Sequence, residues 1–338
     1  MIKLSFILPC YNVAPYFGRC IESIEYQDIP REEYEVICVD DCSKDNTADV
    51  IRTYQKQYPN IRLICHEVNK TAGGARNTGI DAAKGEYLWF VDPDDAIVEN
   101  VLGALTKQIE KLKVDILFFN YNYIDEEGKA HALQQFIGAY DILTGQEFFL
   151  TYCKKKRLAE ITSIWHEVFS ATYLRTKNIR YPEIKSSQDV VFAWHSYLEA
   201  QKVTAIEMMA YDHIRRPSST TGSKGKYRAI NAISGSLLFA SEILELLNVK
   251  PLEKQFERDI VFEIQDAINN DSRIALRMSF KEMRLFYCEI QKYKEKIDAV
   301  QQYMNRKTKK IFNYRLHYPI WQMVILGYVV WDRMKGNE

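Results

Sequence analysis

Three aspartates in the stretch FVDPDDAIVEN could together hold a divalent cation: Asp92, Asp94 and Asp95. They directly follow an apolar, strand-like run at residues 87–91. Mg²⁺ and Mn²⁺ take oxygen ligands, and Mg²⁺ is typically held by one or two carboxylates, with substrate phosphates and water completing its shell. A cation held in this way can activate a diphosphate leaving group. Aspartate is also a common turn residue, so the cluster alone leaves a plain turn open.

Polar side chains also follow three earlier apolar runs of the chain. In open α/β sheets, ligands bind outside the carboxyl ends of the strands. We therefore expect all four polar groups to meet at one edge of a sheet, which favours a ligand site over four separate turns. The three earlier groups are Tyr11 with Asn12, Asp40 with Asp41, and Asn69 with the glycine turn after it.

The elements that would carry these groups alternate along the first 120 residues. Near-continuous apolar runs predict strands at residues 4–8, 34–41, 61–67, 86–92 and 115–121. Helical spacing and capping residues predict helices at residues 16–27, 43–58, 73–85 and 100–113. Buried strands separated by helices predict an α/β fold with a parallel, right-handed sheet.

The remainder of the chain changes in character twice. Residues 141–221 are mixed, with loops and an aromatic stretch, and the chain from residue 227 onward is helical in pattern and poor in Gly and Pro. We place a boundary in TTGSKGK, which predicts one domain at residues 1–221 and a helical region at residues 222–338.

Composition and missing motifs exclude several classes. Lys+Arg and Asp+Glu both number 45, which argues against a general nucleic-acid partner. The 7 cysteines are scattered without CxxC spacing, which favours a reducing, cytoplasmic compartment, and we expect neither a signal peptide nor a spanning segment. The first turn, LPCYNVAPYFGRC, lacks a dinucleotide fingerprint, and no P-loop occurs. It also lacks the glycine-rich, basic loop of a nucleotidyltransferase, which remains an alternative of similar architecture.

Seven segments resemble the family 2 glycosyltransferases of bacterial polysaccharide synthesis, which have the GT-A fold, a Rossmann-like, mostly parallel sheet flanked by helices. The resemblance covers residues 2–221, and a helical C-terminal extension would follow. The first four segments are specific in this order and together, whereas an acid pair alone is weak. The segments are FILPCYN, VDDCSKDNT, GGARNTG, FVDPDD, SIWHEVFSATYLRTKNIRYPE, SSQDVVF and IRRPSST.

The resemblance implies an inverting, metal-dependent transfer of a sugar from a nucleotide-sugar, expected to be a UDP-sugar, to a saccharide or lipid-linked acceptor. Asp94, with Asp92, would hold Mn²⁺ or Mg²⁺. Asp189 matches the catalytic base, which takes the proton of the attacking acceptor hydroxyl. A non-catalytic scaffold of the same fold that binds nucleotide-sugar is the rival. The donor-binding residues implied by the match are Pro9, Tyr11, Asn12, Asp40, Asp41, Arg76, Asp92, Arg216 and Ser219.

Three positions depart from the family's usual pattern. Gln188 replaces a glutamate before Asp189, and the lost charge should ease ionisation of that aspartate. Glu167 stands where relatives often carry a basic or polar residue, which puts acceptor contacts there in doubt. Ile214 takes a position often held by arginine, with Arg215 one place along.

Structural roles remain open for several of the same residues. Asp189 could cap the helix that follows it, and Asp95 could cap a helix after the acid cluster. Arg76 could form an ordinary salt bridge, and Trp165 is expected in the core or as an acceptor platform. His213 could join the metal shell or be a plain strand-end histidine. Two glycines, Gly73 and Gly79, could serve tight packing of a helix on the sheet.

The C-terminal segment combines basic residues with an aromatic, apolar run that is too short to span a bilayer. Such a pattern fits an interfacial helix on an anionic membrane, which would place the chain at the inner face of the plasma membrane. A helix packed on the catalytic domain and a homodimer contact are the alternatives. The pattern comprises Lys307, Lys309, Lys310 and Arg315, followed by Trp321, Tyr328 and Trp331.

Overall fold

The computed structural model describes residues 1–125, 127–133, 136, 140–153, 163–182, 188–215, 280–313 and 315–316, with single positions between 237 and 325. The chain divides into two compact units. The first comprises Met1–Glu183 with Phe192–Thr221, and the second comprises Ile184–Val191 with Gly222–Glu338. Two of the expected donor-binding residues, Arg216 and Ser219, lie outside the described residues.

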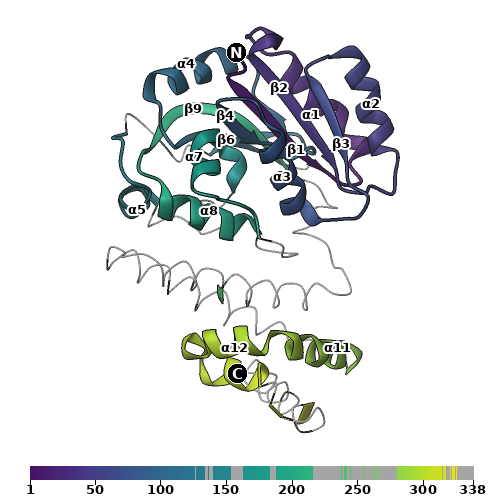
Figure 1. Ribbon diagram of the computed structural model, residues 1–338, viewed down its shortest axis with the longest axis vertical. Helices are drawn as coiled ribbons and strands as arrows, with labels where there is room; N and C mark the ends of the chain where they lie inside the picture. The colour runs from purple at the N-terminus through teal and green to yellow at the C-terminus, as the bar shows by residue number, and fades with distance from the viewer. Residues whose placement is uncertain are drawn as a thin grey trace. The chain divides into compact units, whose positions relative to one another are not determined.

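One sheet forms the centre of the first unit, with its strands in the order β3-β2-β1-β4-β8-β6-β9-β5 and with β7 paired to β6 (Figure 1). The strands β1 to β4 are parallel, as is the pair of β6 and β9. This confirms the expected mostly parallel core. The strand bounds are β1 Leu4–Cys10, β2 Tyr34–Asp40, β3 Ile61–Cys65, β4 Tyr87–Phe90, β5 Ala96–Ile97, β6 Ile116–Ile124, β7 Ala130–Leu133, β8 Glu167–Ser170 and β9 Val203–Ile214.

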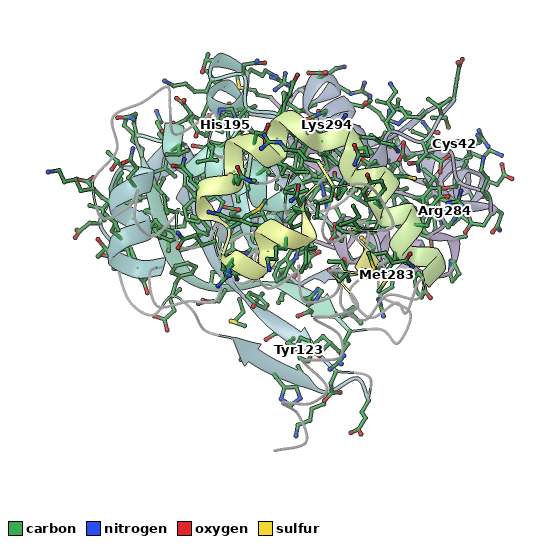
Figure 2. The ribbon with its side chains drawn as sticks, turned by 90° about the horizontal axis from the view of Figure 1, so that it is seen from below. Cys42, Tyr123, His195, Met283, Arg284 and Lys294 are labelled. Atoms are coloured by element: carbon green, nitrogen blue, oxygen red, sulfur yellow. The ribbon has the colours of Figure 1, made fainter. Side chains whose placement is uncertain are left out.

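Antiparallel strands complete the sheet on the far side of β4. The strand β8 lies between β4 and β6 and is antiparallel to both. The short strand β5 runs antiparallel to β9, so the chain just after the acid cluster joins the sheet again. The strands β6 and β7 form an antiparallel hairpin that carries Tyr123 away from the rest of the unit (Figure 2).

The first four helices follow the predicted alternation with the strands. The helix α1 starts with Pro15 in its first turn, where a fixed φ favours a helix start. Its first amides are held from the start of α2, because Thr47 Oγ1 accepts from the N–H groups of Val13 and Ala14 at 2.8 and 3.0 Å. The bounds are α1 Ala14–Glu25, α2 Thr47–Gln57, α3 Thr71–Ala82, α4 Leu102–Leu112, α5 Gly145–Phe148, α7 Ala171–Thr176 and α8 Gln188–Glu199, with the shorter turns η1 Arg31–Glu33, η2 Phe149–Cys153 and η3 Ile164–His166.

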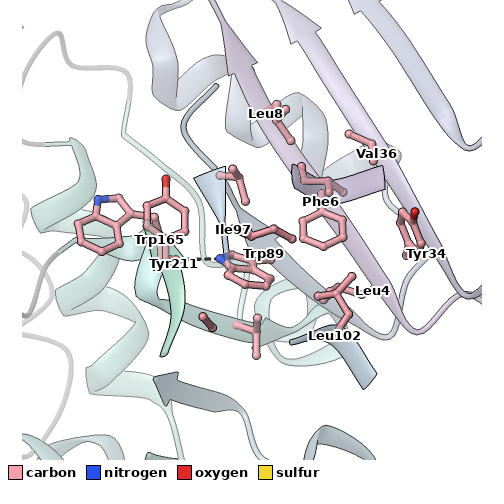
Figure 3. Close-up of a cluster of buried hydrophobic side chains, with 14 of the residues drawn as sticks. Leu4, Phe6, Leu8, Tyr34, Val36, Trp89, Ile97, Leu102, Trp165 and Tyr211 are labelled. Carbon is pink, nitrogen blue, oxygen red and sulfur yellow. Dashed lines mark hydrogen bonds between the residues drawn. The ribbon is translucent and has the colours of Figure 1, made fainter. Parts of the chain in front are cut away.

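The core lies on both faces of the parallel strands, because successive side chains of a strand point to opposite faces. On one face, Phe6 packs against Trp89 with ring centroids 5.5 Å apart (Figure 3). On the other face, Ile7 lies so close to α3 that a Cβ on Gly79 would come within 2.3 Å of it. The packing role considered for Gly79 is therefore supported by the geometry.

The second unit contributes helices in the C-terminal part of the chain, as expected for a helical extension. Tyr287 of α11 donates to the carbonyl of Leu316 at 2.6 Å, and Phe286 packs edge-on against Phe312, so the end of the segment folds back on α11. Figure 2 labels Met283 and Arg284 on α11. The bounds are α11 Phe280–Ile290, η4 Gln291–Tyr293, α12 Lys294–Val300, η5 Gln301–Tyr303 and α13 Arg306–Ile311.

Within the described part of the chain, none of the helices has the length and apolar character needed to cross a bilayer. Of the aromatic residues in the proposed interfacial run, Trp321, Tyr328 and Trp331 all lie outside the described residues.

Candidate active site

The three acids after β4 lie together in the structure. One carboxylate oxygen from each of Asp92, Asp94 and Asp95 lies within 4.8 Å of the other two. Their exposure differs, because Asp95 is 1% exposed whereas Asp92 and Asp94 are half-buried. The cluster is therefore divided into one acid inside the protein and two at its surface.

Three contacts from strand β9 hold the Asp95 carboxylate. Its Oδ2 accepts from the Tyr211 hydroxyl at 2.8 Å and lies 3.1 Å from His213 Nδ1, and its Oδ1 accepts from the Ile214 N–H at 2.8 Å. Burial raises the pKa of Asp95, and the contacts to His213 and Ile214 offset only part of this effect. The residues that follow form β5, so the expectation that Asp95 could cap a helix is wrong.

His213 is held by the same carboxylate. Burial lowers its pKa, but the hydrogen bond and charge of Asp95 outweigh this effect and the pKa of His213 is raised. Its ring stacks on Trp165 at 5.1 Å and 11°, and Trp165 also stacks on Tyr211 at 4.7 Å and 14°. Trp165 is 8% exposed, which agrees with the core position expected for it.

Asp92 is paired with Arg76 of α3. The guanidinium donates to Asp92 Oδ1 at 2.8 Å, so the salt bridge considered for Arg76 is present. The backbone N–H of Asp92 donates to the Tyr211 hydroxyl at 3.2 Å. An arginine that is 5% exposed and faces a half-buried carboxylate brings positive charge to the same point as the acids.

Asp94 lies between Asp92 and Asp95 in the sequence. Its backbone is held by Arg19, a residue of α1. Arg19 donates to the Asp94 carbonyl at 2.6 Å, which fixes the loop without using the Asp94 carboxylate. Because Asp95 is committed to β9, Asp92 and Asp94 are the acids that could face a cation. Closely spaced carboxylate oxygens are the donors that Mg²⁺ and Mn²⁺ prefer, so the residues present fit such an ion.

Two adjacent aspartates at the end of β2 have different environments. Asp41 Oδ1 accepts from the Lys70 N–H at 2.7 Å and lies 2.7 Å from His66 Nδ1. Asp40 is 6% exposed, and its Oδ1 has no hydrogen-bond partner among the described residues. A buried acceptor without a partner is uncommon and indicates a position for a bound donor group.

His66 is the residue that secures Asp41. Its second ring nitrogen, Nε2, lies 2.9 Å from Thr78 Oγ1 of α3, so the imidazole links β2, the loop after β3 and α3. No motif in the sequence marks this histidine. Its only signal is its place at the end of a predicted strand, beside the other strand-end polar groups.

The turn after β1 presents one exposed ring. Tyr11 is 47% exposed, and Pro9 lies within β1 opposite Val39. Asn12 has a left-handed backbone, with φ 53°, and its side-chain oxygen accepts from the Lys44 N–H at 2.7 Å. Asn12 therefore fastens this turn to the loop after β2 and leaves Tyr11 as the group facing outward.

Asp189 lies in the first turn of α8, which begins one residue earlier, at Gln188, so it is inside the helix and not at its N-cap. The aspartate is half-buried. On β8, Glu167 is completely buried, with the Tyr197 hydroxyl of α8 at 3.3 Å, and burial raises the pKa of Glu167 well above its ordinary range. Glu167 is thus an interior residue and does not face solvent.

Comparison with known proteins places the sequence within one family. Residues 5–180, just over half of the chain, match the family described as glycosyl transferase family 2. The chain is 32% identical to a poly(ribitol-phosphate) beta-glucosyltransferase of Bacillus spizizenii, over 60% of this chain and 31% of the relative. It is 26% identical to the poly(ribitol-phosphate) beta-N-acetylglucosaminyltransferase TarS of Staphylococcus aureus, over 76% of this chain and 42% of the relative.

The solved structures extend the likeness to the fold. A crystal structure of residues 1–349 of S. aureus TarS in complex with UDP-GlcNAc matches with a TM-score of 0.71 at 22% identity, covering 99% of this chain and 92% of that one. The chain spans less than half the length of the curated relatives named above. The family match and the shared GT-A fold agree with the strand-end acids found in the sheet, and the chain belongs to glycosyl transferase family 2.

Proposed function

We propose that this protein is an inverting glycosyltransferase that moves a sugar from a UDP-sugar to an acceptor of surface polysaccharide synthesis. The observation that carries the proposal is the cluster of Asp92, Asp94 and Asp95 after β4, with Arg76 bound to one of its acids. This arrangement offers both signs of charge at one point, as a diphosphate and its counter-ion require.

The nucleoside would lie over the ends of β1 and β2. Asp40 offers a buried oxygen that lacks a partner among the described residues, which suits the N–H of a uracil ring. The exposed ring of Tyr11 offers a face for the base, and Asn12 holds the turn that carries it. Asp41 supports the site from beneath through His66 and Lys70.

Asp94, with Asp92, would hold Mn²⁺ or Mg²⁺ between the protein and the diphosphate of the donor. A cation at this place, when bound, neutralises charge that develops on the departing diphosphate. The protein's own part is to hold the two acids in position: Arg19 fixes the Asp94 backbone, and Tyr211 fixes the Asp92 backbone.

Asp189 would act as the base. The acceptor hydroxyl attacks the anomeric carbon from the face opposite the leaving diphosphate, the bond to the diphosphate breaks, and the hydroxyl proton passes to the Asp189 carboxylate. Gln188 is uncharged, so Asp189 is spared the repulsion of the glutamate that usually precedes it. No covalent enzyme intermediate is needed.

The names of two relatives support one class of acceptor. Both are named for poly(ribitol-phosphate), which is a polyol phosphate polymer. We propose a polymer of this kind, free or lipid-linked, as the acceptor, with the reaction taking place in the cytoplasm before export.

The assay that tests the function uses UDP-glucose, UDP-GlcNAc and GDP-mannose with poly(ribitol phosphate), with Mn²⁺ and with EDTA. We expect transfer from one UDP-sugar only, its loss in EDTA and its recovery when Mn²⁺ is added. Asp189→Asn should lower kcat about 100-fold or more while UDP still binds. Asp49→Asn, a change at an exposed aspartate of α2, is the matched control.

Two results would contradict the proposal. Full transfer by Asp189→Asn would remove that residue from the mechanism. UDP binding without transfer of any sugar would favour the rival function, a scaffold of the same fold that binds nucleotide-sugar without turning it over.

Attachment to the membrane is a separate part of the proposal. Lys309 and Lys310 are exposed on α13, next to the buried Ile311, so their charges can be changed without touching the core. Glutamate at both positions should abolish co-sedimentation with anionic phosphatidylglycerol vesicles. Unchanged sedimentation would exclude this contact, and a shift from dimer to monomer without vesicles would identify the surface as a homodimer contact.

A further inference from the structure

The ring of Tyr181 lies between α3 and α8. The Arg76 guanidinium lies over it, with its central carbon 5.3 Å from the ring centroid. The ring also stacks on Phe192 of α8 at 4.0 Å and 4°. The side chain is 2% exposed, so both contacts are made inside the protein, where a cation over an aromatic face is strongest.

The backbone of Tyr181 is fixed to α3 in both directions. Its N–H donates to Asn77 Oδ1 at 2.9 Å, and its carbonyl accepts from Asn77 Nδ2 at 3.0 Å. The ring also meets Phe90, the last residue of β4, edge-on at 5.5 Å. Tyr181 is therefore tied to the helix that carries Arg76 and to the strand that leads into the acid cluster.

The contacts form one continuous series from the donor side to α8. Asp92 binds Arg76, Arg76 lies over Tyr181, and Tyr181 stacks on Phe192. Phe192 stands three residues after Asp189 in the same helix, and residues three apart share a helix face. A change in the position of Arg76 would reach the first turns of α8 through a single aromatic ring.

We propose that Tyr181 is a positioning residue that couples the donor site to the helix carrying Asp189. This role rests on the proposed function. A diphosphate beside the acid cluster competes with Asp92 for the Arg76 guanidinium, and the flat ring passes the resulting shift of Arg76 to Phe192. A stacked pair has a directional geometry that an aliphatic side chain of similar size cannot reproduce.

The test compares Tyr181→Phe with Tyr181→Leu, with UDP binding measured by calorimetry and transfer by steady-state kinetics. Tyr181→Phe keeps the ring and should retain kcat within about twofold. Tyr181→Leu should lower kcat about tenfold to a hundredfold, as expected for a misplaced catalytic group, while the KM for the UDP-sugar and the Kd for UDP change much less. Tyr87→Leu removes another buried tyrosine, at the opposite end of β4, and is the control for general loosening.

Several outcomes would overturn the role. Equal losses of kcat in Tyr181→Leu and Tyr87→Leu, at matched folded fraction, would mean that only general packing is lost. Additive effects of Arg76→Lys and Tyr181→Leu in the double variant would mean that the two residues are not coupled.

If Tyr181→Leu does not fold, Phe192→Leu takes its place, and we expect the same loss of kcat. If the wild type transfers sugar and the variants keep its kcat, Tyr181 has no positioning role, but the proposed function stands. If the wild type transfers no sugar, the proposed function is wrong as well.

Discussion

The hydroxyl of Tyr211 donates to Asp95 at 2.8 Å and accepts from the backbone N–H of Asp92 at 3.2 Å. One side chain of β9 therefore holds both ends of the loop that carries the acids. Asp95 is the buried support of this loop, and Asp92 and Asp94 are the acids that it presents. The sequence motif contains all three, but the structure gives them two different roles.

The division of roles predicts different consequences for the same change at Asp95 and Asp94. Asp95→Asn replaces a buried carboxylate, whose two oxygens face Tyr211, His213 and Ile214, by an amide that can accept through one oxygen only. We expect the free energy of unfolding to fall by about 1–3 kcal/mol. Asp94→Asn should cost less stability than Asp95→Asn, because Asp94 is half-buried and Asp95 is fully buried, and it should abolish the stimulation of UDP binding by Mn²⁺. Urea unfolding and calorimetry measure the two effects.

The reverse pattern would contradict this assignment. If Asp94→Asn unfolded the protein and Asp95→Asn removed only the effect of Mn²⁺, Asp95 would be the residue that faces the cation. Asp49→Asn, at an exposed position in α2, should change neither property and controls for the loss of a carboxylate.

Glu167 predicts a pH dependence of stability. Its raised pKa means that the folded chain binds this proton more tightly than the unfolded chain, in which glutamate titrates near 4.5. The contribution of Glu167 to stability is therefore complete below pH 4.5 and is lost as the pH rises through the raised pKa. In that window the loss is about 1.4 kcal/mol per pH unit for a single group.

The variant Glu167→Gln isolates this effect, because glutamine is neutral at every pH and can still accept from Tyr197. We expect Glu167→Gln to be more stable than the wild type at pH 7–8, and the advantage to disappear towards pH 4.5. Urea unfolding across this range measures the difference, with the exposed Glu99→Gln as control. An advantage that stays constant with pH would show that the carboxyl is already ionised in the folded protein.

Much of the site could be predicted because it lies at strand ends. Apolar runs that end in Asp40 and Asp92 mark the carboxyl edge of parallel strands without any long-range information, and that edge is where the structure places them. Helical patterns between the apolar runs indicate that the strands are parallel and belong to one α/β sheet. The existence of the strands β1 to β4 could follow from such local signals.

The remaining features depend on partners far away in the chain. The contact that makes Asp95 structural comes from Tyr211, 116 residues later, and nothing local distinguishes Asp95 from Asp94. Likewise, Asp40 and Asp41 are adjacent and identical in type, and only His66 and Lys70 show which of them is already bound. The antiparallel strand β8 enters between β4 and β6 from a distant segment, which no local pattern indicates.

Gly79 predicts a packing effect on the helix that carries Arg76. Gly79→Ala would place a methyl group within 2.3 Å of Ile7 in β1, so α3 or the strand must shift. We expect a loss of about 1–3 kcal/mol in the free energy of unfolding and weaker UDP binding, because Arg76 moves with α3. Calorimetric melting and UDP titration measure the two effects.

Gly18→Ala in α1 is the matched control for this change. Its added methyl would meet only the hydroxyl end of Tyr54, at 2.9 Å, and that side chain can move aside. The gain in helix propensity, about 0.5–1 kcal/mol, offsets the contact. Equal destabilisation by the two substitutions would show that close packing of α3 on β1 is not the cause.

The adjacent aspartates at the end of β2 predict opposite outcomes for one substitution. Asp41→Ala leaves the Lys70 N–H and the His66 ring without their acceptor, so stability should fall by about 1–3 kcal/mol. Asp40→Ala removes a buried oxygen that has no partner among the described residues, so stability should stay equal or rise.

The same substitution, Asp40→Ala, should weaken UDP binding. We expect it to raise the Kd for UDP about tenfold, which corresponds to about one hydrogen bond to a base, and to leave pyrophosphate binding unchanged. Equal weakening of UDP and pyrophosphate would place Asp40 away from the nucleobase, because a base contact can act only on the ligand that has a base.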